Sequence, residues 1–353
     1  MSVETPVAPT TDTQLPARGS ARLRTGGALV RARESGLVIL IAIVFLVTTV
    51  RNHNFASSAS IQQLLTGAAI IALLAVGETL VIITRNVDLS VGSVVGLSAY
   101  VVGLAFRDHP HLPVLLGLGL GIAVGAAVGA VNGLVTTVTR VPSLVVTLAT
   151  LYIVRGIDGV IVNGVTIDPG SIPQGFQRIG YDATFGLPWL AVLVAVIVAV
   201  AAYCMRSFRA SRELYAIGSN PDAAALAGIP TGRRVFTAFL VSGCLAGLGG
   251  ALFLALHAQI DVTGGSGYEL TVVAAVVVGG VAIFGGSGTV LGAALGALLL
   301  NTINQSLVAT KVSPFWNQAI AGGLLLAAIA FDRRLTARVA LGLRTAGRSG
   351  HVR

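Results

Sequence analysis

Long apolar runs alternate with short polar breaks along most of the chain, from Leu37 to Phe331. A helix needs about 20 mostly apolar residues to cross the hydrocarbon core of a bilayer. The pattern therefore predicts an all-α polytopic membrane protein with about ten spanning helices, of which the first and eighth are short. The predicted spans are 37–50, 61–84, 89–106, 112–138, 142–161, 187–205, 235–257, 270–284, 289–308 and 314–331.

The segments outside these spans are polar. Residues 1–35 are rich in Thr, Pro, Ala and Arg, and we expect a disordered cytoplasmic tail. The alternative is a basic helix lying on the membrane surface over residues 21–33. Residues 36–331 form the predicted transmembrane domain, with a cytoplasmic loop at 206–234, and residues 332–353 form a basic cytoplasmic tail. The first apolar run begins too late, and is too poorly followed by small-residue cleavage signals, for a removable signal peptide.

Composition narrows the function classes. The 353 residues are 54% hydrophobic and only 10% charged, whereas soluble domains carry about 25% charged residues. An ordinary cytosolic enzyme, a disulfide-bonded extracellular scaffold and a nucleic-acid-binding module are therefore excluded. Cys204 and Cys244 both lie in apolar runs, so neither a disulfide framework nor a zinc site is indicated.

The distribution of positive charge predicts the orientation. With ten spans both termini lie on one side of the membrane, and 18 of the 23 Lys and Arg residues fall on that side. Positive residues concentrate in cytoplasmic segments, so both termini are expected to be cytoplasmic. The positive residues predicted on the other side are Arg51, Arg107, Arg155, Arg178 and Lys311.

Glycines recur at every fourth position of the fourth predicted span, namely Gly117, Gly121, Gly125, Gly129 and Gly133. Small residues let helix backbones approach closely in a membrane, so these glycines are expected to pack helices. A step of four residues drifts around a helix of 3.6 residues per turn. This winding strip predicts a helix surrounded by protein rather than one that faces lipid.

The motifs of common catalytic sites are missing. The chain has no G-x-x-x-x-G-K-[ST] phosphate loop, and its one lysine is Lys311. It also has no H-E-x-x-H motif, no cysteine pair at metal spacing and no convincing Ser/His/Asp set. We therefore expect a non-catalytic chain without a cofactor or a metal site.

Polar residues inside the predicted spans are the candidates for a solute path, because buried charges at membrane depth are costly. Glu78 is either a transport site or a structural acceptor. Asn86 marks a break between two helices, and Asp88 or Ser90 is placed to cap the second of them.

Two further polar groups lie near the outer side. Asn301, Asn304 and Gln305 share one helical face by their spacing. Their uncharged amides suit a neutral polyhydroxylated solute, and they would equally serve as hydrogen bonds between helices. Arg155 and Asp158 are spaced to pair on the outer part of the fifth span.

The cytoplasmic loop at 206–234 contains a predicted two-turn helix over residues 221–227. Asn220 is a good N-cap, Pro221 fits the first helical position and Asp222 complements the helix dipole. Gly228 is placed to end the helix. The helix has a small, smooth face made by Ala223, Ala224 and Ala225. Two turns are too short to be stable alone, so the membrane domain or a partner must hold this helix.

Five segments together resemble one known family: GETLVIITRNVDLSVGS, PSLVVTLATLYIVRG, YAIGSNPDAAALAGI, GYELTVVAAVVVGGVAIFGGSGTVLGAALGALL and PFWNQAIAGGLLLAAIAFDRRL. The chain resembles the branched group of bacterial sugar importer permeases, which includes ribose, xylose, rhamnose and autoinducer-2 transporters, over residues 61–334. The resemblance implies a subunit of an ATP-binding-cassette importer in the bacterial cytoplasmic membrane. Separate ATPase subunits, a second permease (identical or related) and an extracytoplasmic sugar-binding protein would complete the importer, and helix 221–227 would couple this chain to an ATPase.

The residues around the helix break indicate a branch of the family. Many ribose-type members have Gly-Gly where this chain has Arg85-Asn86, and the Thr-Arg-Asn form resembles the rhamnose and autoinducer-2 branch. Between these two solutes we favour rhamnose slightly. The alternative from another class is an ion-coupled secondary carrier with Glu78 as its coupling carboxylate.

Overall fold

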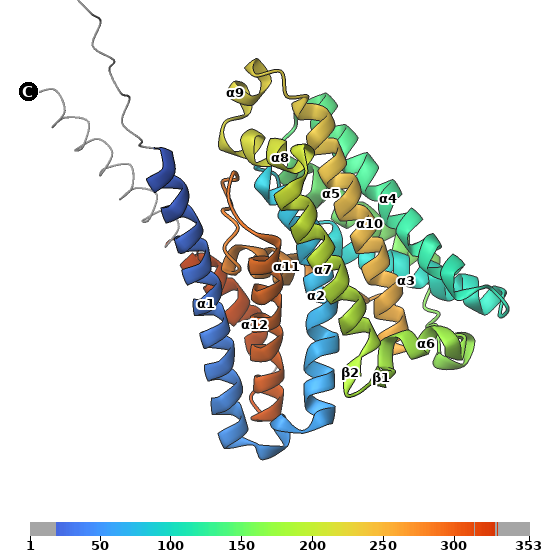
Figure 1. The fold of residues 1–353 in the computed structure, drawn as a ribbon. Helices are drawn as coiled ribbons and strands as arrows, with labels where there is room; N and C mark the ends of the chain where they lie inside the picture. The colour runs from blue at the N-terminus through green and yellow to red at the C-terminus, as the bar shows by residue number, and fades with distance from the viewer. Residues whose placement is uncertain (1–18, 314, 329, 331–353) are drawn as a thin grey trace, which may run out of the picture.

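The computed structural model describes residues 19–313, 315–328 and 330, and its fold is all-α and polytopic, as predicted (Figure 1). Within the described residues, eight helices are long and apolar enough to cross a membrane. They are α1 (Gly19–Arg51), α2 (Ser58–Ile83), α3 (Val91–Asp108), α4 (Val114–Thr139), α5 (Ser143–Val162), α7 (Trp189–Ser207), α10 (Thr231–His257) and α12 (Val290–Ala309).

Short elements mark the two ends of the bundle (Figure 1). One end, called the α6 end here, carries η1 (His53–Ala56), η2 (Pro169–Ser171), α6 (Gln174–Tyr181) and an antiparallel pair of strands, β1 (Ala183–Thr184) and β2 (Leu187–Pro188). The opposite end, called the α9 end, carries α8 (Arg209–Ser219) and α9 (Pro221–Leu226).

Helix α2 forms the centre of the bundle. Its sequence is apolar on every side, which is the pattern of a helix enclosed by others, and nearly all of its residues from Ala68 onward are buried. It packs against α7, α10, α11 (Tyr268–Val278) and α12. The Ser57 hydroxyl caps the N-terminus of α2 by accepting a hydrogen bond from the Ser60 N–H at 3.3 Å.

Helix α1 lies at the edge of the bundle, where it packs against α12 (Figure 1). Its spanning part, Arg33–Arg51, is mostly exposed. The helix begins at Gly19, so residues 19–35 are helical where we expected a disordered tail. The predicted tails at residues 1–18 and 332–353 lie outside the described residues.

The eighth predicted span, 270–284, is wrong as a continuous helix. Helix α11 has 11 residues, which cover about 16 Å at 1.5 Å per residue, roughly half of the hydrocarbon thickness. Residues 258–267, between α10 and α11, fold back into the bundle as irregular chain. Gly264 and Gly265 pack there against Gly92 and Gly96 of α3 so closely that a Cβ atom would overlap backbone.

The segment from α10 to α12 is therefore a discontinuous span, half irregular and half helical. It still returns the chain to the α9 end, so the predicted alternation of the later spans is kept (Figure 1). Irregular backbone at membrane depth occurs where it is buried in protein or lines a cavity. The tenth predicted span is helical over residues 316–328, and the rest of it is not fully described.

The glycines of α4 do pack helices, but α4 is not surrounded by protein. Its buried residues are the five glycines and Asn132, while side chains such as Leu115 and Val138 are exposed. Gly121, Gly125 and Gly129 meet the backbone of α10 around Gly243 and Gly247. Residues at every fourth position form a ridge or groove on a helix surface, and such a row packs along a helix that crosses it. The glycine strip therefore packs along α10, and the other face of α4 is open to lipid.

We predict that Gly125→Ala destabilises the fold. The added methyl group would overlap the backbone of Gly243 and Gly247, and overpacking of this kind costs about 1–3 kcal/mol. Gly119→Ala on the same helix is the matched control, because nothing lies within 4 Å of its Cβ position. Thermal unfolding in detergent checks this, and equal midpoints for the two variants would contradict the packing of α4 on α10.

Candidate functional site

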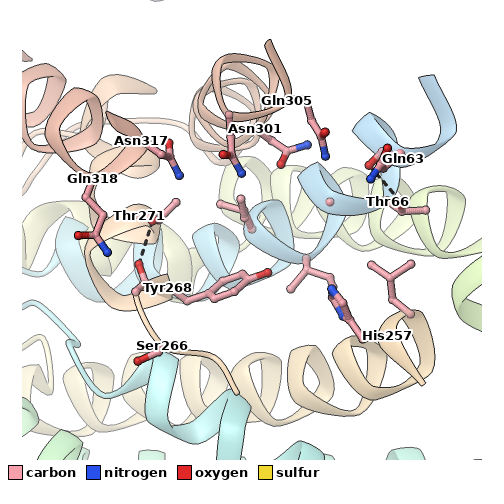
Figure 2. A pocket seen from close by; sticks show the side chains of 16 residues that line it. Gln63, Thr66, His257, Ser266, Tyr268, Thr271, Asn301, Gln305, Asn317 and Gln318 are labelled. Atoms are coloured by element: carbon pink, nitrogen blue, oxygen red, sulfur yellow. Dashed lines mark hydrogen bonds between the residues drawn. The ribbon is translucent and has the colours of Figure 1, made fainter. Parts of the chain in front are cut away.

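A cavity of about 470 Å³ lies among α2, α10, α11, α12 and the helical residues 316–328 (Figure 2). Its volume is in the range of small-molecule sites. Most of its lining side chains are polar, and none of them is Asp, Glu, Lys or Arg. The lining consists of Gln63, Thr66, Gly67, Ile70, Ile71, Leu256, His257, Ser266, Gly267, Tyr268, Thr271, Asn301, Asn304, Gln305, Asn317 and Gln318.

Helix α12 contributes three amides from one face, as the spacing predicts. Asn301 is 4% exposed, and its Nδ2 donates to the Leu64 carbonyl of α2 at 2.8 Å. Its amide therefore joins two helices. Asn304 and Gln305 also line the cavity, and the side-chain amide of neither makes a hydrogen bond with the described part of the chain. The predicted role in joining helices therefore belongs to Asn301, and solute binding stays a prediction for Asn304 and Gln305.

The N-terminus of α11 forms another wall of the cavity, through Ser266, Gly267, Tyr268 and Thr271 (Figure 2). Gly267 has a φ of 86°, in the left-handed region that glycine adopts easily. The first N–H groups of a helix lack intrahelical acceptors, so a helix that begins inside the bundle presents donors there. Sequence reasoning missed this wall, although the closely spaced Gly264, Gly265 and Gly267 indicate a break before the apolar run.

Aromatic rings lie beside the polar groups. Phe253 stacks on His257 with ring centroids 4.1 Å apart and meets Tyr268 edge to face at 6.0 Å. The position of His257 at a helix end is typical of a solvated residue, but the structure places it in the cavity wall. His257, Ser266 and Tyr268 also line a neighbouring cavity of about 250 Å³. The ring faces suit the carbon skeleton of a solute whose hydroxyl groups meet the amides.

Three more amides complete the lining and were also missed. Gln63 comes from the first turns of α2, and Asn317 and Gln318 from the start of the helix at 316–328 (Figure 2). Each is a polar residue near an end of an apolar run, and that is the signal that sequence reasoning could have used. Within the described residues, no three His, Cys, Asp or Glu side chains are grouped to hold a metal ion.

The carboxylates predicted for the solute path lie elsewhere. Glu78 of α2 is fully buried, and its Oε1 accepts a hydrogen bond from the Asp88 N–H at 3.1 Å. Asp88 Oδ1 in turn accepts from the Ser90 N–H at 3.0 Å and from the Ser90 hydroxyl at 2.6 Å. Neither carboxylate lines the cavity. Both hold the predicted break, which spans residues 84–90 between α2 and α3.

Of the two residues predicted to cap α3, Asp88 accepts from the Ser90 N–H at the start of the helix, but Ser90 does not cap it. Ser90 occupies the N-cap position without a hydrogen bond from its side chain to the helix. Its hydroxyl donates to Asp88 and accepts from Nδ2 of Asn132 at 2.8 Å. Asn132 also accepts from the Thr150 hydroxyl at 2.7 Å, so the break is tied to α4 and α5. Buried polar groups need such partners. The Ser90 hydroxyl bonds within this network and therefore does not bind the first N–H groups of α3.

Asn86 remains within the break. Its Nδ2 donates to the carbonyl and to the hydroxyl of Thr84, both at 3.0 Å. This local turn confirms that Asn86 belongs to an irregular connection between helices, and it places Asn86 outside the cavity lining.

We predict that Glu78→Gln has little effect, whereas Glu78→Ala destabilises the fold. Gln keeps an oxygen that accepts from the Asp88 N–H. Ala leaves that buried donor without a partner, at a cost of about 1–3 kcal/mol. Thermal unfolding and uptake, measured for both variants, check this. Loss of uptake in a fully folded Glu78→Gln variant would contradict the structural role.

The predicted Arg155–Asp158 pair is also wrong. Arg155 Nη1 donates to the Gly264 carbonyl of the discontinuous span at 2.7 Å. Asp158 is 1% exposed, and both of its carboxylate oxygens lack a hydrogen-bond partner among the described residues. The guanidinium of Arg155 binds the carbonyl of Gly264, an acceptor in irregular backbone that sequence spacing does not reveal. Neither residue lines the cavity of Figure 2.

The short helix predicted in the loop at the α9 end is confirmed to within one residue. Helix α9 begins at Pro221, and the Asn220 side chain caps it by accepting from the Ala223 N–H at 3.1 Å. Asp222 lies in the first turn. The helix ends at Leu226, and Gly228 follows with a φ of 79°.

The alanines of α9 divide into two sets. Ala224 is 4% exposed and anchors the helix, whereas Ala223 and Ala225 are exposed. The large apolar side chain of Leu226 is 91% exposed at the tip of the bundle. The surface of α9 that faces away from the bundle therefore consists of exposed alanines and one exposed leucine.

Helix α8, which the sequence did not resolve, supports α9. Glu213 of α8 accepts from Arg234 Nε of α10 at 2.6 Å and from Arg209 Nε at 2.9 Å. The hydrogen bond from Arg234, aided by that from Arg209, holds the pKa of Glu213 below its usual range. This carboxylate therefore stays charged at neutral pH and ties α8 to α10.

Comparisons with known proteins agree with this architecture. Residues 60–329 match the family model described as "Branched-chain amino acid transport system / permease component". The autoinducer 2 import system permease protein LsrC of Photorhabdus luminescens is 35% identical over 86% of this chain and 90% of its own length. The LsrC proteins of Escherichia coli O9:H4 and Enterobacter sp. 638 are 33% and 35% identical, over 88% and 87% of this chain and 90% and 88% of their own lengths.

No solved structure matches the chain. The family model covers the cavity and α9, and the relatives match most of the chain's length. The chain therefore belongs to the family of branched-chain amino acid transport system permease components, and it is a multi-pass membrane protein.

Proposed function

We propose that this chain forms the transmembrane path of an ATP-binding-cassette importer for a small, neutral, polyhydroxylated solute. The observation that carries the proposal is the cavity of about 470 Å³, which is lined mainly by amides, hydroxyls and aromatic rings. Such groups form hydrogen bonds with hydroxyl groups, and the lining contains no Asp, Glu, Lys or Arg side chain to attract an ion. The cavity lies at the break of the discontinuous span, where transporters commonly place a solute site.

The α9 end faces the cytoplasm in this proposal. Arg85, Arg140, Arg206, Arg212 and Arg233 all lie at or near that end. The positive-inside rule assigns such an end to the cytoplasmic side of a membrane. The α6 end, with its strand pair, then faces outward toward a solute-binding protein.

ATP hydrolysis takes place on separate subunits in this proposal, and this chain is non-catalytic. Support comes from the lack of a phosphate loop in the sequence and from the exposed face of α9. Helix α9 would dock on an ATPase subunit through Ala225 and Leu226. A second permease, identical or related, would complete the membrane part of the importer.

The relatives favour one solute over the other that we considered. All three compared proteins are named as autoinducer 2 import permeases. We therefore propose autoinducer 2 ahead of rhamnose, which stays an alternative of the same chemical kind.

Uptake by reconstituted vesicles tests the proposal. The chain, its native ATPase subunits and its binding protein are placed in vesicles, and labelled autoinducer 2 or rhamnose is supplied outside with the binding protein. The proposal predicts uptake that requires ATP at the ATPase side and does not change when proton or sodium gradients are collapsed. Uptake by this chain alone, driven by an ion gradient without ATP, would contradict it and establish an ion-coupled carrier.

A further inference from the structure

The last turn of α8, which leads into α9, is held by Arg85 of the helix break. Arg85 Nε donates to the Gly218 carbonyl and Nη2 to the Ser219 carbonyl, both at 2.6 Å. Arg85 has a φ of 67°, a conformation that residues other than glycine seldom adopt. The two charge-assisted bonds are of the stronger kind. They fix the α8–α9 unit to the break between α2 and α3.

The loop between α11 and α12, residues 279–289, is fixed at the same point. The Tyr215 hydroxyl of α8 donates to the Gly288 carbonyl at 3.0 Å. The Gly286 N–H donates to the Ile83 carbonyl, at the end of α2, at 2.9 Å. Gly218 lies so close to this loop that a Cβ atom would overlap both the Ile83 carbonyl and the Gly286 nitrogen. These contacts, from Arg85, Tyr215, Gly218, Gly286 and Gly288, form a packed unit that we call the α8 junction.

The loop of the α8 junction continues directly into α11. Residues Val272 to Val277 of this helix are buried. Arg33 of α1 holds the C-terminal end of α11 by donating to the carbonyls of Val277 at 3.3 Å and Gly280 at 3.2 Å. The hydrogen bonds of a helix fix its length, so a displacement at one end of α11 would reach the other end, about 16 Å away.

The other end of α11 is the wall of the cavity. Ser266, Gly267 and Tyr268 lie there (Figure 2). Gly267 itself is in the left-handed region, which permits the chain to change direction at this point. One continuous set of contacts therefore runs from α9 through α8, the α8 junction and α11 to the cavity.

We propose that Arg85 and Tyr215 are positioning residues that pass a movement of α9 to the N-terminus of α11. Binding of ATP by the ATPase subunit then changes the exposure of the cavity wall at residues 266–268. This inference rests on the proposed function, because it takes α9 as the docking element. It adds the route by which the docked ATPase reaches the solute site.

The test uses a single reporter cysteine in the cavity wall. Ser266→Cys is introduced into a chain in which Cys204 and Cys244 are replaced by alanine, and the complex with its native ATPase is purified. The rate of labelling by a membrane-impermeant methanethiosulfonate reagent is measured with and without a non-hydrolysable ATP analogue. We expect the analogue to change the rate at least about fivefold, the lower end of typical coupling factors.

Adding Arg85→Ala and Tyr215→Phe together should remove most of this response while the ATPase stays bound. Tyr215→Phe alone, a milder change, should reduce it. Arg212→Ala is the matched control, since this arginine of α8 donates to the Ser207 carbonyl at 3.2 Å, away from the loop. The control should keep the full response.

The outcomes separate the two proposals. A full response in Tyr215→Phe and in the double variant would overturn the role of the α8 junction and leave the proposed function in place. A parent complex that binds its ATPase but shows no response at the reporter cysteine would also overturn the junction alone. A parent chain that binds no ATPase would overturn both proposals.

Discussion

Leu226→Glu should abolish binding of the ATPase subunit while leaving the membrane domain folded. Leu226 is 91% exposed, so the change removes no packing within the chain. Burying a leucine at an interface contributes about 1.5–3 kcal/mol, and an unpaired carboxylate in its place adds a desolvation cost. We expect co-purification of the ATPase to fall by about a hundredfold, with an unchanged melting temperature of the permease.

Two variants control for this result. Phe185→Glu places the same charge on a fully exposed aromatic residue at the α6 end and should keep the ATPase bound. Ala224→Glu places it on the buried side of α9 and should unfold the loop as well as prevent docking. Normal ATPase binding by the Leu226→Glu variant would show that α9 is not part of the docking surface.

Replacing the two free amides of α12, Asn304→Leu with Gln305→Leu, should lower solute uptake by about tenfold or more. Each hydrogen bond to a solute contributes about 0.5–1.5 kcal/mol, and the loss of two corresponds to about this factor. Because neither amide bonds to the described part of the chain, the fold should keep its stability. Uptake in reconstituted vesicles, with ATPase binding and melting temperature measured in parallel, checks this.

Asn301→Leu provides the contrast on the same helical face. Its amide joins α12 to the Leu64 carbonyl of α2, so its loss should lower the melting temperature. Full uptake by the double variant would show that the solute does not contact this face of α12. Equal effects on melting temperature for all three positions would contradict the division between structural and solute-facing amides.

Most spans could be predicted from the sequence because hydrophobicity and length alone define a full crossing. The discontinuous span could not. Its apolar run from Leu270 to Phe284 resembles a short helix, but the helix begins at Tyr268 and ends at Val278. Where it begins depends on the contacts of Gly264 and Gly265 with α3, and such contacts between distant segments leave no local pattern.

The glycine strip of α4 shows a similar division. The sequence correctly predicted close packing, because small residues at every fourth position permit backbone contact. It did not reveal how many neighbours the helix has. One partner, α10, accounts for most of the strip, with Gly117 meeting Phe106 of α3.

For the candidate site, the shared face of Asn301, Asn304 and Gln305 could be predicted from helical spacing. The rest of the cavity could not, since Gln63, His257 and Tyr268 come from three different helices. Glu78 and Asp88 attracted attention because charge in a membrane is costly. The structure shows that a buried helix break can require carboxylates as acceptors for its own backbone and side chains.

The most direct test of the central claim is to purify the tagged chain from its native cell in mild detergent and identify every bound protein. The account predicts a stoichiometric ATPase subunit, together with a second permease that is either this chain or a relative. Repeated recovery of the chain alone, in a form that transports under an ion gradient without ATP, would contradict it.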